Sequence, residues 1–360
     1  MTDKDQGGWI VRTGVSCTKR SLGSHKTERS SMRGSSTNQA LRAPRRVRAD
    51  RQTLRWVLAH EPPVVFDEAA ESFVELVRGG TDGAIEVELL LGPEDALSRG
   101  EHVSRTELVR CVQRGEIEMA HCYVAALGTF SDPLWAVELP FLFRDYDHAE
   151  AVFEGPVGQR LLDGLLPAGI RGLAFAYSGG YRILPTLGRE LHTLEDFAGL
   201  RCRTSGNPVP QALHAALGGR AIGAPLEAIA GMVHGDQIDG CEITYVRFAA
   251  TGLDQVFDTI NETHHSLFTT MTVVNEAWFQ GLAPRHREAI ADAARRSCRT
   301  ERRVAIREEQ VTRRAYAEAG VKIVALEPEQ RGRLQGVGRA VRGQLTSRFG
   351  ADLIEAIEAL

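Results

Sequence analysis

Arg203 is the residue of this sequence whose type and setting best fit anion binding. It lies near the end of a short predicted strand, Leu200 to Thr204, which follows a one-turn helix capped by Asp196 and ended by Gly199. A guanidinium held on a strand is a permanently charged fork that matches a carboxylate with two parallel hydrogen bonds. The alternative is a salt bridge at the surface or between domains. We favour the carboxylate clamp.

Two further patterns resemble those of catalytic or metal-binding sites. Ala176 to Gly180 resembles the nucleophile elbow of hydrolases with Ser178 as nucleophile, but a short apolar run broken by Pro185 follows where the elbow needs a helix. His264 and His265 are adjacent, so on a strand they would point to opposite faces and could not share a metal. We therefore expect no catalytic site and no metal site.

The cysteines and the common cofactor motifs also point away from an enzyme. The chain has no dinucleotide-binding, P-loop, zinc-protease or EF-hand pattern, so no cofactor is expected. Its six cysteines lack CxxC or zinc-ligand spacing and most lie in apolar runs, which predicts buried thiols rather than a disulfide framework. These cysteines are Cys17, Cys111, Cys122, Cys202, Cys241 and Cys298.

The first half of the chain predicts a parallel sheet that can position such groups. Strand patterns at 54–59, 85–89 and 117–124 alternate with helical patterns that begin at Asp67 and Val103. In a β-α-β-α-β arrangement the carboxyl ends of the strands face a ligand crevice. Candidate pocket residues at these ends are His60 and the group His121, Cys122 and Tyr123.

The second half predicts a second domain, a return strand and one long helix. After a strand at 172–177, Gly179 and Gly180 allow a sharp crossing into a region with two helices and short strands, and a strand at 267–274 returns to the first sheet. From Pro284 to Glu318 no glycine or proline interrupts an apolar stripe, which predicts a helix on the order of 50 Å long. The alternative is two helices broken near 299–303. A strand at 321–324 and helices at 329–348 and 351–359 follow.

Four motifs, in this order and spacing, give the chain a family resemblance. They are Leu139-Pro140-Phe141, Gly180-Tyr181-Arg182, the segment 194–204 and the segment 235–242. Together they resemble the DctP-type solute-binding subunits of tripartite ATP-independent periplasmic (TRAP) transporters, from about Leu54 to the C-terminus. The resemblance implies an α/β, two-lobed periplasmic-binding-protein-like fold with a hinge and a long helix spanning both lobes. Residues 52–177 and 267–300 would form lobe I, and residues 178–266 and 301–360 lobe II with the C-terminal helices.

The resemblance also assigns roles to site residues. Arg203 matches the arginine that grips the cargo carboxylate, and Arg182 matches a second cargo-contacting arginine, so the pair would suit a dianion or an acid bearing hydroxyls. Glu242 would be a buried carboxylate that orients Arg203, or else a ligand contact. Ile243 stands where sugar-acid binders often carry asparagine, which argues against a sialic-acid-like cargo. Tyr123 or His60 would contact the anion from the other lobe.

The function implied by the resemblance is transport. The protein would capture a small organic carboxylate by hinge closure in the periplasm, deliver it to TRAP-type membrane permease subunits, act as a monomer and not be an enzyme. Two alternatives stay open: a ligand-sensing or scaffold protein of the same fold, and a hydrolase using Ser178.

Composition and charge are consistent with a soluble binding protein. Hydrophobic residues make up 43% and charged residues 25% of the 360. Residues 1–51 carry 12 Lys or Arg against 4 Asp or Glu, a net charge of +8, whereas the rest carries 31 against 43, a net −12. An acidic body argues against nucleic-acid binding. The first 51 residues predict a disordered tail, and no apolar run of seven or more follows their basic residues, so no signal peptide is recognised.

Overall fold

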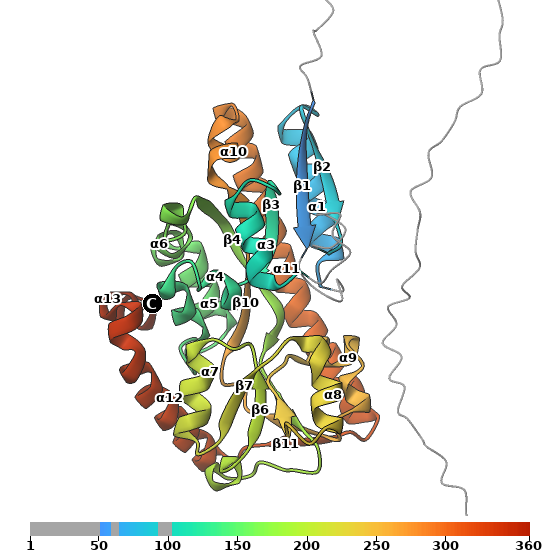
Figure 1. The fold of residues 1–360 in the computed structure, drawn as a ribbon, viewed down its shortest axis with the longest axis vertical. Coiled ribbons are helices and arrows are strands. Elements are labelled where there is room, and N and C mark those ends of the chain that lie inside the picture. The colour runs from blue at the N-terminus through green and yellow to red at the C-terminus, as the bar shows by residue number, and fades with distance from the viewer. Residues whose placement is uncertain (1–50, 59–64, 93–102) are drawn as a thin grey trace, which may run out of the picture.

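The strands of the protein form two separate sheets, and helices pack around both (Figure 1). The computed structural model describes residues 51–58, 65–92 and 103–360. The predicted tail therefore lies outside the described residues apart from Arg51. Among the residues that are described, every helix is too short or too polar to cross a lipid bilayer.

In the first sheet four strands run in one direction and one strand, β10, runs in the opposite direction. Its strand order is β2-β1-β3-β10-β4, with β1 parallel to both β2 and β3, and β10 antiparallel to both β3 and β4. The bounds are β1 (Gln52–Leu58), β2 (Ile85–Leu90), β3 (Met119–Tyr123), β4 (Ile170–Tyr181) and β10 (Leu267–Asn275). The βαβ alternation in the first half of the sequence is thus confirmed as parallel pairing, and the return strand is confirmed as β10.

Helices cover this sheet because their apolar faces are buried against its strands. Ser104 caps α3 by accepting a hydrogen bond from the Glu107 amide at 3.1 Å, and Asp145 caps α5 through the His148 amide at 2.7 Å. The bounds are α1 (Asp67–Gly80), α3 (Arg105–Gln113), α4 (Val124–Leu127), η1 (Asp132–Glu138), α5 (Tyr146–Glu154), α6 (Pro156–Asp163), η2 (Leu166–Ala168) and α10 (Glu276–Gly281).

The second sheet is mixed and is built from short strands. Its order is β11-β9-β5-β8-β6-β7, in which β6 runs parallel to both β7 and β8. The strands are β5 (Leu184–Thr186), β6 (Arg201–Thr204), β7 (Arg220–Gly223), β8 (Gly240–Cys241), β9 (Thr259–Glu262) and β11 (Lys322–Ala325). The helical elements beside it are η3 (Leu194–Phe197), α7 (Pro208–Ala216), η4 (Leu226–Ala228), α8 (Ile229–His234), α9 (Tyr245–Ala250) and η5 (Leu253–Gln255).

One helix, α11 (Pro284–Glu318), runs unbroken for 35 residues alongside both sheets (Figure 1). It packs on α1 and β4 of the first sheet and on α9 beside the second. The alternative of a break near 299–303 is wrong, because α11 continues through these residues; there Arg302 donates a 2.7 Å hydrogen bond to the Phe175 carbonyl and forms an ion pair with Glu154. Two C-terminal helices follow, α12 (Pro328–Phe349) and α13 (Ala351–Glu358).

Strand β4 continues past Ser178, which removes the basis of the hydrolase alternative. The elbow needs a sharp turn into a helix after the nucleophile, whereas here the strand continues to Tyr181, with an irregular register against β10 between Tyr177 and Tyr181. The Ser178 hydroxyl is fully buried and has no hydrogen-bond partner among residues 51–58, 65–92 and 103–360. Gly179 and Gly180 have φ values of 83° and 93°, so the predicted need for glycine at this crossing is confirmed.

Candidate functional site

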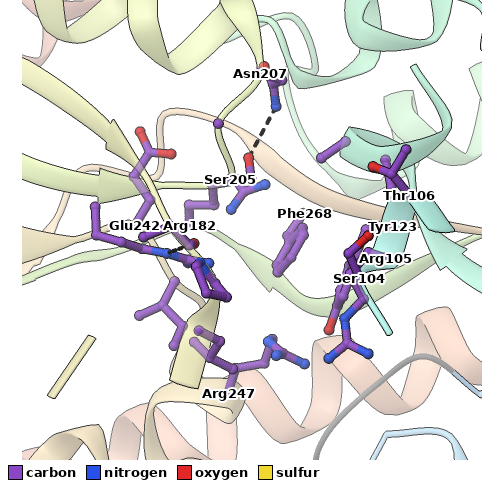
Figure 2. A pocket seen from close by; sticks show the side chains of 18 of the residues that line it. Ser104, Arg105, Thr106, Tyr123, Arg182, Ser205, Asn207, Glu242, Arg247 and Phe268 are labelled. Carbon is purple, nitrogen blue, oxygen red and sulfur yellow. Dashed lines mark hydrogen bonds between the residues drawn. The ribbon is translucent and has the colours of Figure 1, made fainter. Parts of the chain in front are cut away.

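A cavity of about 330 Å³ lies between the two sheets, and its walls come from both (Figure 2). Such a volume lies at the lower end of the range typical of small-molecule sites. On one side, β3 of the first sheet contributes Tyr123 and α3 contributes Arg105. On the other side, β6 of the second sheet contributes Arg203 and α9 contributes Arg247. Four arginines and two glutamates line this cavity, so its lining carries an excess of positive charge, which favours an anion.

Arg203 lies in β6 and lines the cavity as the sequence predicts. Its Nε donates to the Ala224 carbonyl at 2.8 Å, which fixes the direction of the guanidinium. Among the described residues no acceptor lies within hydrogen-bonding distance of its two terminal nitrogens. Burial lowers the pKa of Arg203 from its ordinary value, and the nearby positive charges of Arg182 and Arg247 lower this pKa further. The fork is therefore rigid, charged and unpaired.

Arg182 also lines the cavity, but its charge already has a partner. Its Nη2 lies 3.1 Å from the Glu138 carboxylate, and both side chains are buried. Glu138 accepts a second hydrogen bond from Asn207, which follows β6, so this carboxylate joins elements of the two sheets. Burial raises the pKa of Glu138. The guanidinium of Arg182 also stacks 3.9 Å above the centre of the Phe268 ring.

Glu242 does not orient Arg203, which corrects the expectation from sequence. Its carboxylate accepts hydrogen bonds from His214 at 3.0 Å and His265 at 3.1 Å, and only its backbone amide contacts the Arg203 carbonyl. Although burial opposes ionisation, these two histidines hold the pKa of Glu242 well below its usual value. The sequence correctly predicts that the strand before Glu242 runs beside the strand of Arg203. It does not show that His214 and His265 both contact the Glu242 carboxylate.

The remaining predicted residues fall into three groups. Tyr123 and Ile243 line the cavity, from the first and second sheet respectively. His60 lies outside the described residues. His121 and Cys122 do not line the cavity. Cys122 lies on the opposite face of β3 from Tyr123, because successive side chains of a strand alternate between its faces. His121 shares the face of Tyr123 but lies two residues before the end of the strand.

His121 belongs instead to a buried polar cluster with Cys298 and Glu301. Its Nδ1 lies 2.9 Å from the Thr272 hydroxyl and its Nε2 lies 3.2 Å from the Glu301 carboxylate. The side-chain atoms are close enough to bind a metal ion. These contacts already pair the polar atoms with one another, which is the arrangement expected of a satisfied interior network.

Two cavity arginines escaped the sequence analysis. Arg247 is the third residue of α9, and its side chain is only 6% exposed. Arg105, the first residue of α3, lies 3.8 Å from Glu227 of η4, and both line the cavity, so this ion pair joins an element beside the first sheet to one beside the second. Neither residue stands in a motif. The sequence feature that could have indicated Arg247 is its position in an apolar stretch, Tyr245-Val246-Arg247-Phe248. A charged residue is rarely buried in such a stretch unless it has a partner or a function.

A family model described as bacterial extracellular solute-binding protein, family 7 (DctP), matches residues 59–344 of this chain. Two similar relatives are the 2,3-diketo-L-gulonate-binding periplasmic protein YiaO of Escherichia coli and the C4-dicarboxylate-binding periplasmic protein DctP of Rhodobacter capsulatus. Each is 26% identical over 81% of this chain and 86% of the relative.

Solved structures give the same result for the fold. A TRAP periplasmic solute-binding protein from Ochrobactrum anthropi matches with a TM-score of 0.77 and 26% identity, covering 86% of this chain and 95% of that one. One from Shewanella oneidensis with bound succinate matches with a TM-score of 0.77 and 21% identity over 86% and 99% of the two chains. These neighbours have the two-lobed periplasmic-binding fold that the sequence predicts.

Proposed function

This chain belongs to the DctP family of bacterial extracellular solute-binding proteins, and from that premise we propose that it captures a small organic carboxylate in the cavity between its two sheets. The observation that carries the proposal is the Arg203 guanidinium, which lines that cavity with no carboxylate partner among the described residues. A carboxylate would supply the missing charge and two acceptors in the geometry that the fork requires.

Hinge closure is the proposed mode of capture. The chain crosses between the two sheets at the end of β4 and again between β9 and β10, and α11 packs on both halves. Each crossing can bend without disturbing either core. An anion that contacts Arg203 on one side and Tyr123 on the other favours the closed form, because only that form offers both contacts at once.

The biological setting follows from the family. Proteins of this family and its structural neighbours bind solutes rather than transform them, and the relatives named above are periplasmic. We place this protein in the same compartment, as a monomer that passes its cargo to a TRAP-type membrane permease and performs no catalysis.

The test is calorimetric titration of the purified protein with a panel of organic acids. Wild-type protein should bind at least one acid, and Arg203→Ala should weaken that binding by ~100-fold or more, because a buried charged hydrogen-bonding pair is lost. Arg203→Lys keeps the charge but not the fork, so its affinity should fall between the two.

The matched control is Arg201→Ala, two residues earlier in the same strand. Arg201 is held by Asp239 at 2.6 Å and Asp236 at 2.7 Å and does not line the cavity, so its loss should leave affinity unchanged. Equal affinities for wild type and Arg203→Ala would reject the clamp.

A further inference from the structure

A second cavity, of about 610 Å³, lies beside the crossings that join the two halves of the protein. We call it the hinge cavity, and the cavity lined by Arg203 the cargo cavity. The walls of the hinge cavity come from the loop before α5, from the ends of the two crossings, from the start of α9, and from α11 and α12. None of its lining residues lines the cargo cavity, so it is a separate site.

The lining of the hinge cavity carries an excess of positive charge. Arginines outnumber acids in it, as Arg144, Arg313, Arg331, Arg339 and Arg342 stand against Asp145 and Glu309. Arg313 is ion-paired with Glu262 and Arg342 with Glu358. Within residues 51–58, 65–92 and 103–360, the guanidinium groups of Arg331 and Arg339 have neither a carboxylate at ion-pair distance nor a hydrogen-bond acceptor. Their N–H groups are therefore available to an anion.

Helix α12 directs these two arginines to one side. Arg331, Gln335 and Arg339 are four positions apart and all line the cavity, as expected for side chains that share one face of a helix. Arg331 also lies near the second crossing. Burial lowers the pKa of His264 there, Glu262 opposes this change, and the positive charge of Arg331 adds to it. His264 is thus neutral at pH 7, and Arg331 supplies the charge at this wall.

Aromatic side chains make up much of the remaining wall. Five of the fifteen lining residues are Phe or Tyr, whereas aromatic residues are 6% of the chain. The ring centres of Tyr146 and Tyr181 lie 5.0 Å apart, and the buried Tyr181 hydroxyl has no hydrogen-bond partner in the described part of the chain. Such a wall offers surfaces on which a planar ring can pack. A small inorganic anion would leave most of this volume and these rings uncovered.

We propose that the hinge cavity is a second ligand site, that its ligand is an aromatic ring bearing a carboxylate or phosphate, and that this ligand strengthens cargo binding. Arg331 and Arg339 supply the positive charge, and the rings of Tyr146 and Tyr181 supply the apolar surface. The volume lies within the range of small-molecule sites and exceeds that of the cargo cavity.

The effect on cargo rests on the hinge closure proposed above and on the two crossings. Tyr181 lines the hinge cavity and the next residue, Arg182, lines the cargo cavity. His264 lines the hinge cavity, and the next residue, His265, is hydrogen-bonded to Glu242 of the cargo cavity. Movement of either crossing therefore changes both cavities.

The sign of the effect follows from the form of the protein described here. The ion pair between Arg105 and Glu227 and the hydrogen bond from Asn207 to Glu138 join the two halves around the cargo cavity. The hinge cavity with its gathered arginines belongs to this same form. A ligand that fits it stabilises the form in which both halves can contact cargo, so each ligand raises the affinity for the other.

The first experiment is calorimetric titration of the full chain with 2-naphthoate, 2-naphthyl phosphate and the neutral 2-naphthalenemethanol. At least one anion should bind ~10-fold or more tightly than the alcohol, and the tighter anion identifies the preferred group. Arg331→Gln and Arg339→Gln should each weaken that anion by ~10-fold, because charged hydrogen bonds are lost. Arg203→Ala should leave its affinity unchanged, because Arg203 lies in the other cavity.

The matched control is Arg333→Gln, in the same helix. Arg333 is ion-paired with Glu195 and does not line the hinge cavity, so its loss should not change the affinity for the anion. The site is overturned if no probe binds, if the alcohol binds as tightly as both anions, or if Arg203→Ala abolishes binding while Arg331→Gln keeps it. The last result would move the anion to the cargo cavity.

The second experiment titrates the cargo acid with and without a saturating concentration of the tighter naphthyl anion. Cargo should bind ~5-fold or more tightly when the anion is present, and this gain should disappear in Arg331→Gln. Unchanged or weaker cargo binding would overturn the coupling while the hinge site and the proposed function stand. A wild-type chain that binds no cargo acid would overturn the proposed function and the coupling, and the hinge site is then decided by the first experiment alone.

Discussion

Single residues in this cavity differ in whether their charge has a partner. Arg182, expected from sequence to contact cargo, is paired with Glu138, whereas Arg247, which no motif marks, has no ion-pair partner within the described part of the chain. Glu242 serves two histidines rather than an arginine. Arg182 still lines the cavity, so its contact with cargo stays a prediction, but a guanidinium that already has a carboxylate partner contributes less net attraction for an incoming anion.

Replacing Glu242 with Gln should lower the free energy of unfolding at pH 7 by about 2 kcal/mol, because two buried imidazoles lose a charged acceptor. The pKa of Glu242 is depressed in the folded protein, so its contribution is present above the unfolded value of 4.5 and is lost as pH falls through the folded value. Urea unfolding from pH 7 to pH 3 would show the gap between wild type and variant narrowing below about pH 4.5. A gap that stays constant would contradict this account.

The crossing of β4 between the two halves depends on its two glycines. At Gly180, which has φ of 93°, an added Cβ would approach the Glu309 carboxyl carbon to 2.7 Å and would also meet the Tyr146 hydroxyl. At Gly169, with φ of 73°, nothing lies within 4 Å of an added Cβ. The two positions therefore separate backbone strain from steric overlap.

Gly180→Ala should destabilise the protein by about 2–3 kcal/mol, from left-handed strain plus displacement of the Glu309 and Tyr146 side chains. Gly169→Ala should cost only the strain, about 1 kcal/mol. Chemical denaturation of both variants beside wild type measures the difference. Equal losses would mean that crowding at the crossing adds nothing.

At the scale of the whole molecule, the two halves are joined by strands and by the long helix α11. Glu309 of α11 connects these parts, because it accepts a hydrogen bond from the Tyr181 amide at 3.1 Å and another from the Tyr146 hydroxyl. Burial raises the pKa of Glu309, the hydrogen bonds from Tyr146 and Tyr181 lower it, and the negative charge of Glu262 adds a smaller increase; the resulting pKa is about 7. The junction therefore contains a carboxyl group that titrates near neutral pH.

Glu309→Gln should make the melting temperature less sensitive to pH between 5 and 8. The folded state favours the protonated carboxyl, so its contribution is complete below the unfolded pKa of 4.5 and is lost as pH rises through about 7. Gln is neutral at every pH and can still accept from Tyr181, so the variant should melt above wild type at pH 8. Melting curves that run parallel across this range would show that Glu309 does not titrate there.

The sequence by itself determined the order of elements and the strand that carries Arg203, whose role as anion ligand stays a prediction. Alternation of strand and helix patterns predicted parallel pairing in the first sheet, and an uninterrupted apolar stripe predicted the helix at 284–318. It also placed Arg203 on a strand, and β6 begins within one residue of the predicted start. These features are local, so spacing and turn chemistry along the chain suffice to predict them.

Only the tertiary structure decided which charges meet. Glu138 and Arg182 are 44 residues apart, and His214, Glu242 and His265 come from three different segments. Arg247 and Arg203 line one cavity because α9 and β6 converge at it. Such pairings depend on how distant elements pack, and the free energy of a buried charge depends on that surrounding rather than on its neighbours in sequence.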